Sequence, residues 1–140
     1  MNPASICQAL QATDVIRHLG LDIDGTITAD SPRFAQLASA VLDSGGRIVV
    51  ITSRSIVART ETMRELASYR LRYSALHFLP SIDEGTRLCP HHDLDWFSRY
   101  LWGKVAIADN CGVTDFVDDD PRVIDLFRRY SPHINAWLVT

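Results

Sequence analysis

Five apolar runs along the chain have the length of buried β-strands, and segments with helical spacing separate them. The clearest run, 47–52, is a continuous and mainly β-branched series, which is typical of a parallel strand buried on both faces. Glycine, proline and polar residues bound the other runs. The predicted strands are the second half of 15–23 and the runs 47–52, 73–79, 113–117 and 133–139.

Apolar residues recur at helical spacing between these runs. Ser31 and Pro32 predict a helix start, with Ser31 as the N-cap, and Gly45-Gly46 predicts the end of that helix. A weaker helical pattern lies within 1–14 and includes Thr13. The remaining predicted helices are 55–72, with Val57, Thr60, Met63, Leu66, Ala67 and Leu71 facing inward, and 94–102, 104–110 and 121–130.

The alternation of strands and helices predicts the fold class. We expect an α/β three-layer sandwich, with an open, mostly parallel five-stranded Rossmann-like sheet and helices on both faces. Segment 81–93 has no apolar period and is predicted to be a loop. The aromatic residues expected in the core are Trp96, Phe97, Trp102 and Trp137.

Composition narrows the class of protein. At 140 residues, with 46% hydrophobic and 22% charged residues, the chain predicts a single domain spanning 1–140. A net charge of −3 gives no strong indication of a nucleic-acid partner, although a homo-oligomer is compatible with it. The odd number of cysteines favours a cytoplasmic protein. No signal peptide or membrane-spanning run is apparent.

Polar side chains follow three of the predicted strands. Asp22 and Asp24 come at the end of the first, 52–54 (Thr-Ser-Arg) at the end of the second, and Asp118-Asp119 after 113–117. Lys104 is the single lysine of a chain whose other cationic side chains are arginines. Because ligands bind at the carboxyl ends of strands in open α/β sheets, these residues are the candidate site.

The pair of Asp22 and Asp24 carries the first indication of chemistry. Residues i and i+2 of a strand share a face, so we expect two crowded carboxylates that call for a cation or a raised pKa. A turn with an N-cap is the alternative interpretation. Phosphoryl transfer to an aspartate needs this combination of carboxylates, a hydroxyl, an ammonium and Mg²⁺.

These residues resemble the motifs of the haloacid dehalogenase-like (HAD) phosphohydrolase superfamily. Asp22-x-Asp24-Gly25-Thr26, Thr52, Lys104 and Asp118-Asp119 occur in that family's order. The resemblance implies that Asp22 is the nucleophile and stays ionised, whereas Asp24 carries a proton as general acid and later acts as base. Thr52 would bind the phosphoryl oxygens, helped by backbone N–H groups near Asp24 and Ser53, and Lys104 would pair with Asp22 and the phosphate. Independently of the resemblance, Arg54 is a candidate to contact the leaving group of the substrate, with a surface arginine that lies over the helix start as the alternative.

The resemblance also implies a Mg²⁺ site. Its ligands would be the Asp22 carboxylate, the Asp24 carbonyl and an acid of the fourth motif. We expect Asp119 to bind the metal directly, and Asp118 to act through water or to hold Lys104. Asp120 is expected to be the N-cap of the helix that begins at Pro121.

The segments between the motifs are too short for a large cap domain, so we expect an open site. The segment 81–93 is the expected specificity element. Zinc binding by Cys89, His91 and His92, with His77 or Asp93, is an alternative that lacks the usual second cysteine pair. Polar loop residues without a metal are the favoured interpretation.

The sequence thus predicts a Mg²⁺-dependent phosphatase with an aspartyl-phosphate intermediate. Its substrate would be a phosphorylated small molecule, such as a nucleotide or sugar phosphate, or a phosphorylated polymer end. A catalytically silent phosphate-binding or signalling module of the same fold is the first alternative. A phosphotransferase is the second, although the absence of a water-excluding cap weighs against it.

Overall fold

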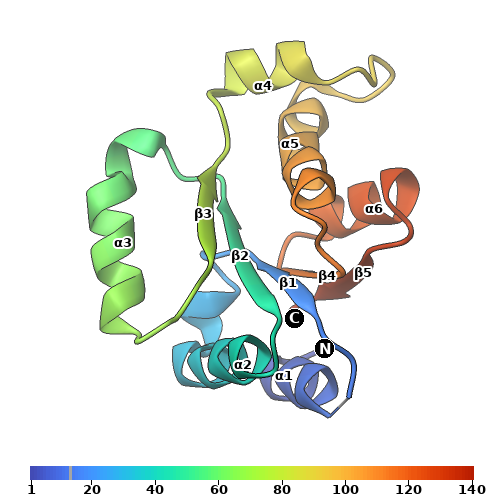
Figure 1. The fold of residues 1–140 in the computed structure, drawn as a ribbon. Coiled ribbons are helices and arrows are strands. Elements are labelled where there is room, and N and C mark those ends of the chain that lie inside the picture. The colour runs from blue at the N-terminus through green and yellow to red at the C-terminus, as the bar shows by residue number, and fades with distance from the viewer. Residues whose placement is uncertain (13) are drawn as a thin grey trace.

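The predicted strands form one sheet in which all neighbours are parallel. The computed structural model describes residues 1–12 and 14–140, so Thr13 lies outside the described residues. The strand order is β3-β2-β1-β4-β5, which places β1 at the centre (Figure 1). The strands are β1 (His18–Leu21), β2 (Arg47–Thr52), β3 (Ala75–Phe78), β4 (Asp115–Asp118) and β5 (Asn135–Leu138).

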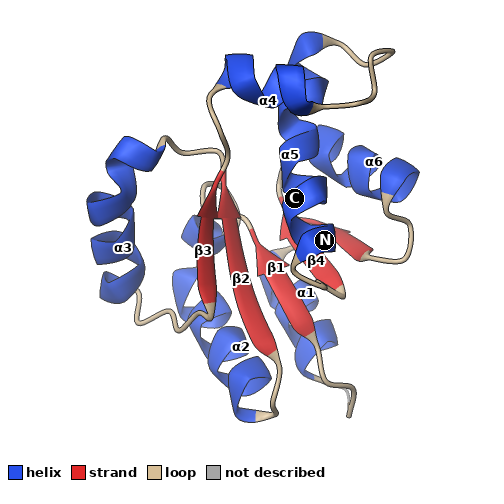
Figure 2. Ribbon diagram, turned by 45° about the horizontal axis from the view of Figure 1, so that its top comes forward, coloured by secondary structure: helices blue, strands red, loops and turns tan. Residues whose placement is uncertain are grey.

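Helices cover both faces of this sheet, as the alternating pattern predicts. The layer of α1 (Pro3–Gln11) and α2 (Ser31–Asp43) packs on one face, and α5 (Trp96–Asn110) and α6 (Pro121–Tyr130) pack on the other (Figures 1 and 2). Each face has its own buried hydrophobic cluster. The α/β three-layer prediction is therefore confirmed. Among the described residues, no helix has both the length and the hydrophobicity that a membrane crossing requires.

Two further helices lie next to the β3 edge and the carboxyl ends of the strands. α3 (Arg59–Ser68) stands beside β3, and α4 (Ile82–Leu88) lies above the carboxyl ends of the strands, against α5 (Figure 1). Short 3₁₀ turns, η1 (Ile27–Ala29) and η2 (Ile56–Ala58), precede α2 and α3.

Glycines account for two corrections to the predicted helices. The segment 81–93 is not entirely a loop, because α4 forms within it, and α5 continues through Gly103 instead of ending there. A Cβ on Gly103 would lie 3.0 Å from the Leu79 side chain, and one on Gly85 would lie 3.0 Å from that of Tyr100. Both glycines therefore permit close packing and do not end a helix.

The remaining corrections concern the N-cap of α2 and residues that we expected to be buried but that are exposed. The N-cap of α2 is Asp30, whose carboxylate accepts from the Arg33 backbone N–H, and not Ser31. On α3 only Thr62 and Leu66 are buried, whereas Val57, just before it, is 90% exposed. The expected inward face was therefore largely wrong, with Thr60, Met63 and Ala67 also exposed. Trp96 is exposed as well, and Phe97, Trp102 and Trp137 are half-buried.

Candidate active site

The carboxyl ends of the central strands bring the predicted site residues together. Asp22 directly follows β1, Thr52 ends β2 and Asp118 ends β4, so parallel pairing places all three at one edge of the sheet. α5 crosses this edge and brings Lys104 to it from the middle of the helix. A cavity of about 310 Å³ opens here, lined in part by Asp22, Asp24, Ser53, Lys104, Asp118 and Asp119.

The Lys104 ammonium lies between two buried carboxylates. Its Nζ donates to Asp22 Oδ1 at 2.8 Å and to Asp118 Oδ2 at 2.7 Å, and all three side chains are at most 6% exposed. Asp118 Oδ1 also accepts from the Asp120 backbone N–H at 2.9 Å. The side chain of Asp118 thus holds Lys104 and the turn after β4, while Asp120 caps α6 as expected.

Burial governs the charge state of this cluster. It raises the pKa of Asp22 to about 7, although Lys104 pulls that pKa down and Asp118 pushes it further up. Burial also raises the pKa of Asp118. Burial alone would lower the pKa of Lys104, but the two carboxylates outweigh it and keep that pKa raised, so the amine stays protonated.

A third carboxylate completes a group that fits a metal ion. Oxygens of Asp22, Asp118 and Asp119 lie within 4.8 Å of one another, and Asp119 is exposed to solvent. Three carboxylates around one ammonium leave an excess of negative charge, and hard oxygen ligands suit Mg²⁺. The donor set therefore fits the cation that the sequence predicts, with Asp22 and Asp119 as candidate ligands.

Gly25 allows Asp119 to approach the turn after β1. Its φ is +81°, a backbone conformation that residues other than glycine adopt only with strain. A Cβ at this position would clash with Asp119 Oδ2. Glycine in the Asp-x-Asp-Gly motif thus serves both the backbone conformation and the space for the third carboxylate.

Asp24 lies in a different environment from Asp22, contrary to the expected shared face. β1 ends at Leu21, so the i and i+2 rule for strands does not apply to a turn in which Asp22 is buried and Asp24 is 62% exposed. The Arg54 guanidinium donates to Asp24 Oδ2 at 3.0 Å and to Oδ1 at 2.8 Å. These bonds lower the pKa of Asp24.

The pKa values of the two aspartates therefore differ in the opposite sense to the sequence prediction. We expected an ionised Asp22 beside an Asp24 that carries a proton. Among the protein's own groups, burial raises the pKa of Asp22 and Arg54 lowers that of Asp24. The expectation assumed that a metal ion is present, which would favour the ionised Asp22, and it took no account of Arg54.

Arg54 is engaged by protein groups instead of facing the cavity freely. Besides Asp24, it donates to Glu65 Oε2 at 3.0 Å and to Thr62 Oγ1 at 3.3 Å, both on α3. Tyr69 donates to the same Glu65 oxygen at 2.9 Å. This network makes Arg54 a positioning residue for Asp24 and fastens α3 to the site.

Several hydroxyl side chains lie at this edge of the sheet. Thr52 is fully buried, and its Oγ1 accepts from the Arg54 backbone N–H at 3.1 Å, while Ser53 lines the cavity. Sequence reasoning missed two residues. Thr26 donates to Asp22 Oδ2 at 3.2 Å, and Tyr100 donates to the Ser53 carbonyl at 3.2 Å. Tyr100 lies four residues before Lys104, so its helical spacing would have indicated it.

The suggested zinc ligands make separate contacts. His91 stacks on Tyr130 with ring centroids 3.8 Å apart, His92 contacts Arg99, and Asp93 pairs with Arg129. Across the described residues, Asp22, Asp118 and Asp119 form the group that could hold a metal ion.

Two solved structures share the fold of this chain. A chain of the Pnkp1/Rnl/Hen1 RNA repair complex matches with a TM-score of 0.64 and 20% sequence identity, over 92% of this chain and 44% of that chain. A chain from another structure of the Pnkp1/Rnl/Hen1 complex matches with a TM-score of 0.64 and 19% identity, over 91% of this chain and 47% of that chain. This chain therefore spans less than half the length of either. No protein-family model and no curated protein matches it significantly.

We expect Mg²⁺ to bind more weakly as pH falls from 8 to 6, because protons compete for Asp22. With the pKa of Asp22 at about 7, the ionised fraction falls about tenfold over this range. Isothermal titration calorimetry should show about a tenfold rise in Kd. Without Mg²⁺ the pH dependence of stability has the opposite sign: because the pKa of Asp22 is raised in the folded state, the fold loses stability as pH rises from about 4 to 7. Equal affinities at both pH values would contradict the assignment of Asp22 as a ligand.

We expect Gly25→Ala to weaken Mg²⁺ binding by about tenfold or more, because the new methyl group displaces Asp119. Gly45→Ala is a matched control, since Gly45 also has positive φ, at +92°, and its Cβ would meet only Ile16 at 4.0 Å. Both variants should lose about 1 kcal/mol of stability through backbone strain. A Gly45→Ala variant that binds Mg²⁺ as weakly as Gly25→Ala would show that strain alone is responsible.

Proposed function

We propose that this chain is a Mg²⁺-dependent phosphatase of the HAD type. The observation that carries the proposal is the Lys104 ammonium held between Asp22 and Asp118. It supports a site in which a carboxylate and a phosphate meet beside fixed positive charge. Bound Mg²⁺ would let the anionic nucleophile approach an anionic phosphate.

Asp22 and Asp24 have different roles in the two chemical steps: Asp22 forms and releases the covalent bond to phosphorus, and Asp24 transfers the protons. An Asp22 carboxylate oxygen attacks phosphorus, the bond from phosphorus to the ester oxygen breaks, and that oxygen takes a proton from Asp24. Water then attacks the aspartyl-phosphate and gives its proton to Asp24. The bond between phosphorus and Asp22 breaks, which releases inorganic phosphate and restores both carboxyl groups.

Arg54 sets the protonation state of Asp24 by lowering its pKa. The ion pair favours the ionised form of Asp24, which is the form needed as a base in the hydrolytic step. Donation of a proton in the first step requires this pair to loosen. The pair is partly exposed, so the energy of loosening is modest.

The substrate we propose is a phosphate monoester at the end of a nucleic acid strand. The RNA repair context of the two structural neighbours supports a phosphorylated polymer end over a small sugar phosphate. The site also agrees with a bulky substrate, because α4 contributes only Ile82 to the described lining of the cavity. The negative net charge does not favour long-range attraction of RNA, so local contacts must provide the binding.

We expect hydrolysis of p-nitrophenyl phosphate with Mg²⁺, and a loss of about a thousandfold or more in kcat for Asp22→Asn. Asp125→Asn is the control, because it removes an exposed carboxylate of α6 that does not line the catalytic cavity. Steady-state kinetics with both variants tests the proposal. A wild-type chain that hydrolyses no phosphoester, yet is modified by beryllofluoride at Asp22, would be a silent phosphate-binding module.

We expect Arg54→Gln to slow hydrolysis of an alkyl phosphate by about tenfold more than that of p-nitrophenyl phosphate, because Asp24 loses the two hydrogen bonds that position it and the p-nitrophenolate leaving group needs little acid catalysis. Loss of Arg54 also lets the pKa of Asp24 rise, so the basic limb of the alkyl phosphate profile should move to higher pH. Arg122→Gln removes a similar pair with Asp120 and is the control. Identical pH profiles for wild type and Arg54→Gln would contradict the positioning role.

A further inference from the structure

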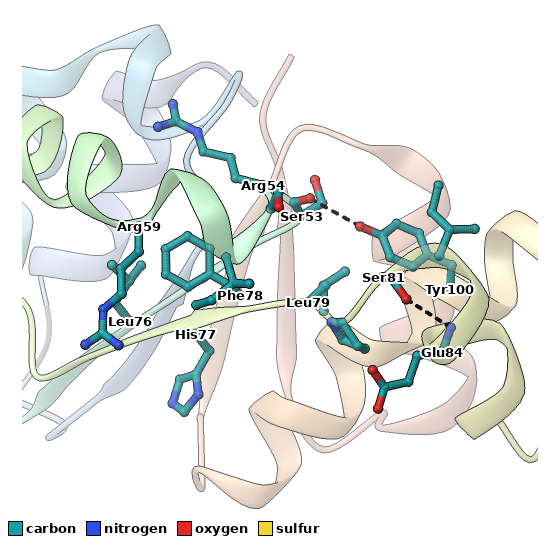
Figure 3. A pocket seen from close by; sticks show the side chains of 14 residues that line it. Ser53, Arg54, Arg59, Leu76, His77, Phe78, Leu79, Ser81, Glu84 and Tyr100 are labelled. Atoms are coloured by element: carbon teal, nitrogen blue, oxygen red, sulfur yellow. Dashed lines mark hydrogen bonds between the residues drawn. The ribbon is translucent and has the colours of Figure 1, made fainter.

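A second and larger cavity runs beside the candidate active site, along the free edge of β3. Its volume is about 730 Å³, within the range of ligand sites. The start of α3 forms one wall, and the segment that leads into α4 forms the other (Figure 3). We call it the β3 trough; its lining includes Arg54, Ile56, Arg59, Leu76, Phe78 and Ile82.

The β3 trough and the catalytic cavity adjoin. Ser53, Ile82 and Tyr100 line both, so they form the boundary between them. The Tyr100 hydroxyl donates to the Ser53 carbonyl, which fixes this boundary (Figure 3). A substrate whose phosphate reaches Asp22 would extend over this boundary, and its next groups would enter the β3 trough.

The trough exposes apolar and aromatic side chains of the kind that globular proteins usually bury. Phe78 and Leu76 lie on the side of β3 that faces Arg59, whereas His77 projects from the other side (Figure 3). The Phe78 ring is half-buried. Ile56 is 56% exposed on one wall and Ile82 is 44% exposed on the other. Exposed apolar side chains on both walls of a groove indicate a ligand that covers them.

A cation lies over the same stretch. The Arg59 side chain is exposed and, within the described part of the chain, has no side-chain hydrogen bond or ion pair. Arg54, at the inner end, is already paired with Asp24 and Glu65. The trough also contains Glu84, at the α4 end, whose backbone N–H bonds Ser81. Arg59, beside Leu76 and Phe78, is therefore the cation of the trough lining that is left to meet a ligand anion (Figure 3).

We propose that the β3 trough binds the nucleotides that precede the terminal phosphate of a single-stranded nucleic acid, with a base against Phe78 and a backbone phosphate at Arg59. This inference rests on the proposed phosphatase function and adds a specificity site to it. Aromatic stacking combined with a cation along the backbone is how proteins hold single strands without reading their sequence. A position at the sheet edge lets the polymer continue into solvent.

An extended peptide that adds a strand to the β3 edge is a weaker fit. β3 has only four residues, which gives little backbone for pairing. Continuity with the carboxylate cluster also favours a ligand that carries a phosphate. A peptide would use the backbone of β3 and would depend little on Arg59.

Binding of a fluorescein-labelled single-stranded oligoribonucleotide tests the proposal, with the terminal phosphate at the 3′ end in one probe and at the 5′ end in another. Anisotropy is measured with Mg²⁺ and the Asp22→Asn chain, which prevents turnover, over a series of salt concentrations. Arg59→Ala in this background should reduce the slope of log Kd against log salt concentration by about 0.7, the value for one phosphate contact on a single strand. Phe78→Leu should weaken binding by about tenfold.

Arg64→Ala is the matched control, because Arg64 is also an exposed arginine of α3 but does not line the trough. It should leave both affinity and salt slope unchanged, and thermal unfolding should show that Phe78→Leu remains folded. Equal effects of Arg59→Ala and Arg64→Ala, or no binding of either probe at low salt, would overturn the proposal. In that case a peptide or another ligand occupies the trough. Hydrolysis of p-nitrophenyl phosphate tests the phosphatase separately, so the two proposals can fail independently.

Discussion

The buried ion triad of Lys104, Asp22 and Asp118 is the constraint on which the rest of the site depends. It joins the ends of β1 and β4 to the middle of α5, and each of its members is nearly inaccessible to water. Removing one partner of such a group leaves an unpaired buried charge, which typically costs about 3–5 kcal/mol. The position of the candidate nucleophile is thus fixed by the same contacts that hold two layers of the fold together.

Asp22 and Asp24 show how one short turn gives two carboxylates different properties. Asp22 is buried beside Lys104 and two further carboxylates, whereas Asp24 projects toward solvent and pairs with Arg54. Pairs of acids whose surroundings push their pKa values apart are typical of sites that need both a nucleophile and a proton carrier. The Arg54 network also ties the weakly buried α3 to this turn, so the chemistry at Asp24 is linked to the wall of the β3 trough.

Much of the framework follows from sequence because strands buried on both faces leave a clear pattern. The run 47–52 predicts β2 without error, and the acids that follow strands indicate where the site lies. Helix ends were harder to predict, since Gly85 and Gly103 resemble helix breakers until their close neighbours are known. Arg54 was assigned to substrate for a similar reason: no local pattern reveals that Glu65 and Thr62 lie beside it.

The sequence has one lysine, and that lysine is the centre of the buried triad. Selective isotope labelling of lysine would therefore give a single side-chain resonance from the whole chain, free of overlap and located at the candidate nucleophile. Any event that changes the charge around Asp22 or Asp118 would be visible in that one signal. The scarcity of lysine thus makes Lys104 a built-in spectroscopic reporter on this site.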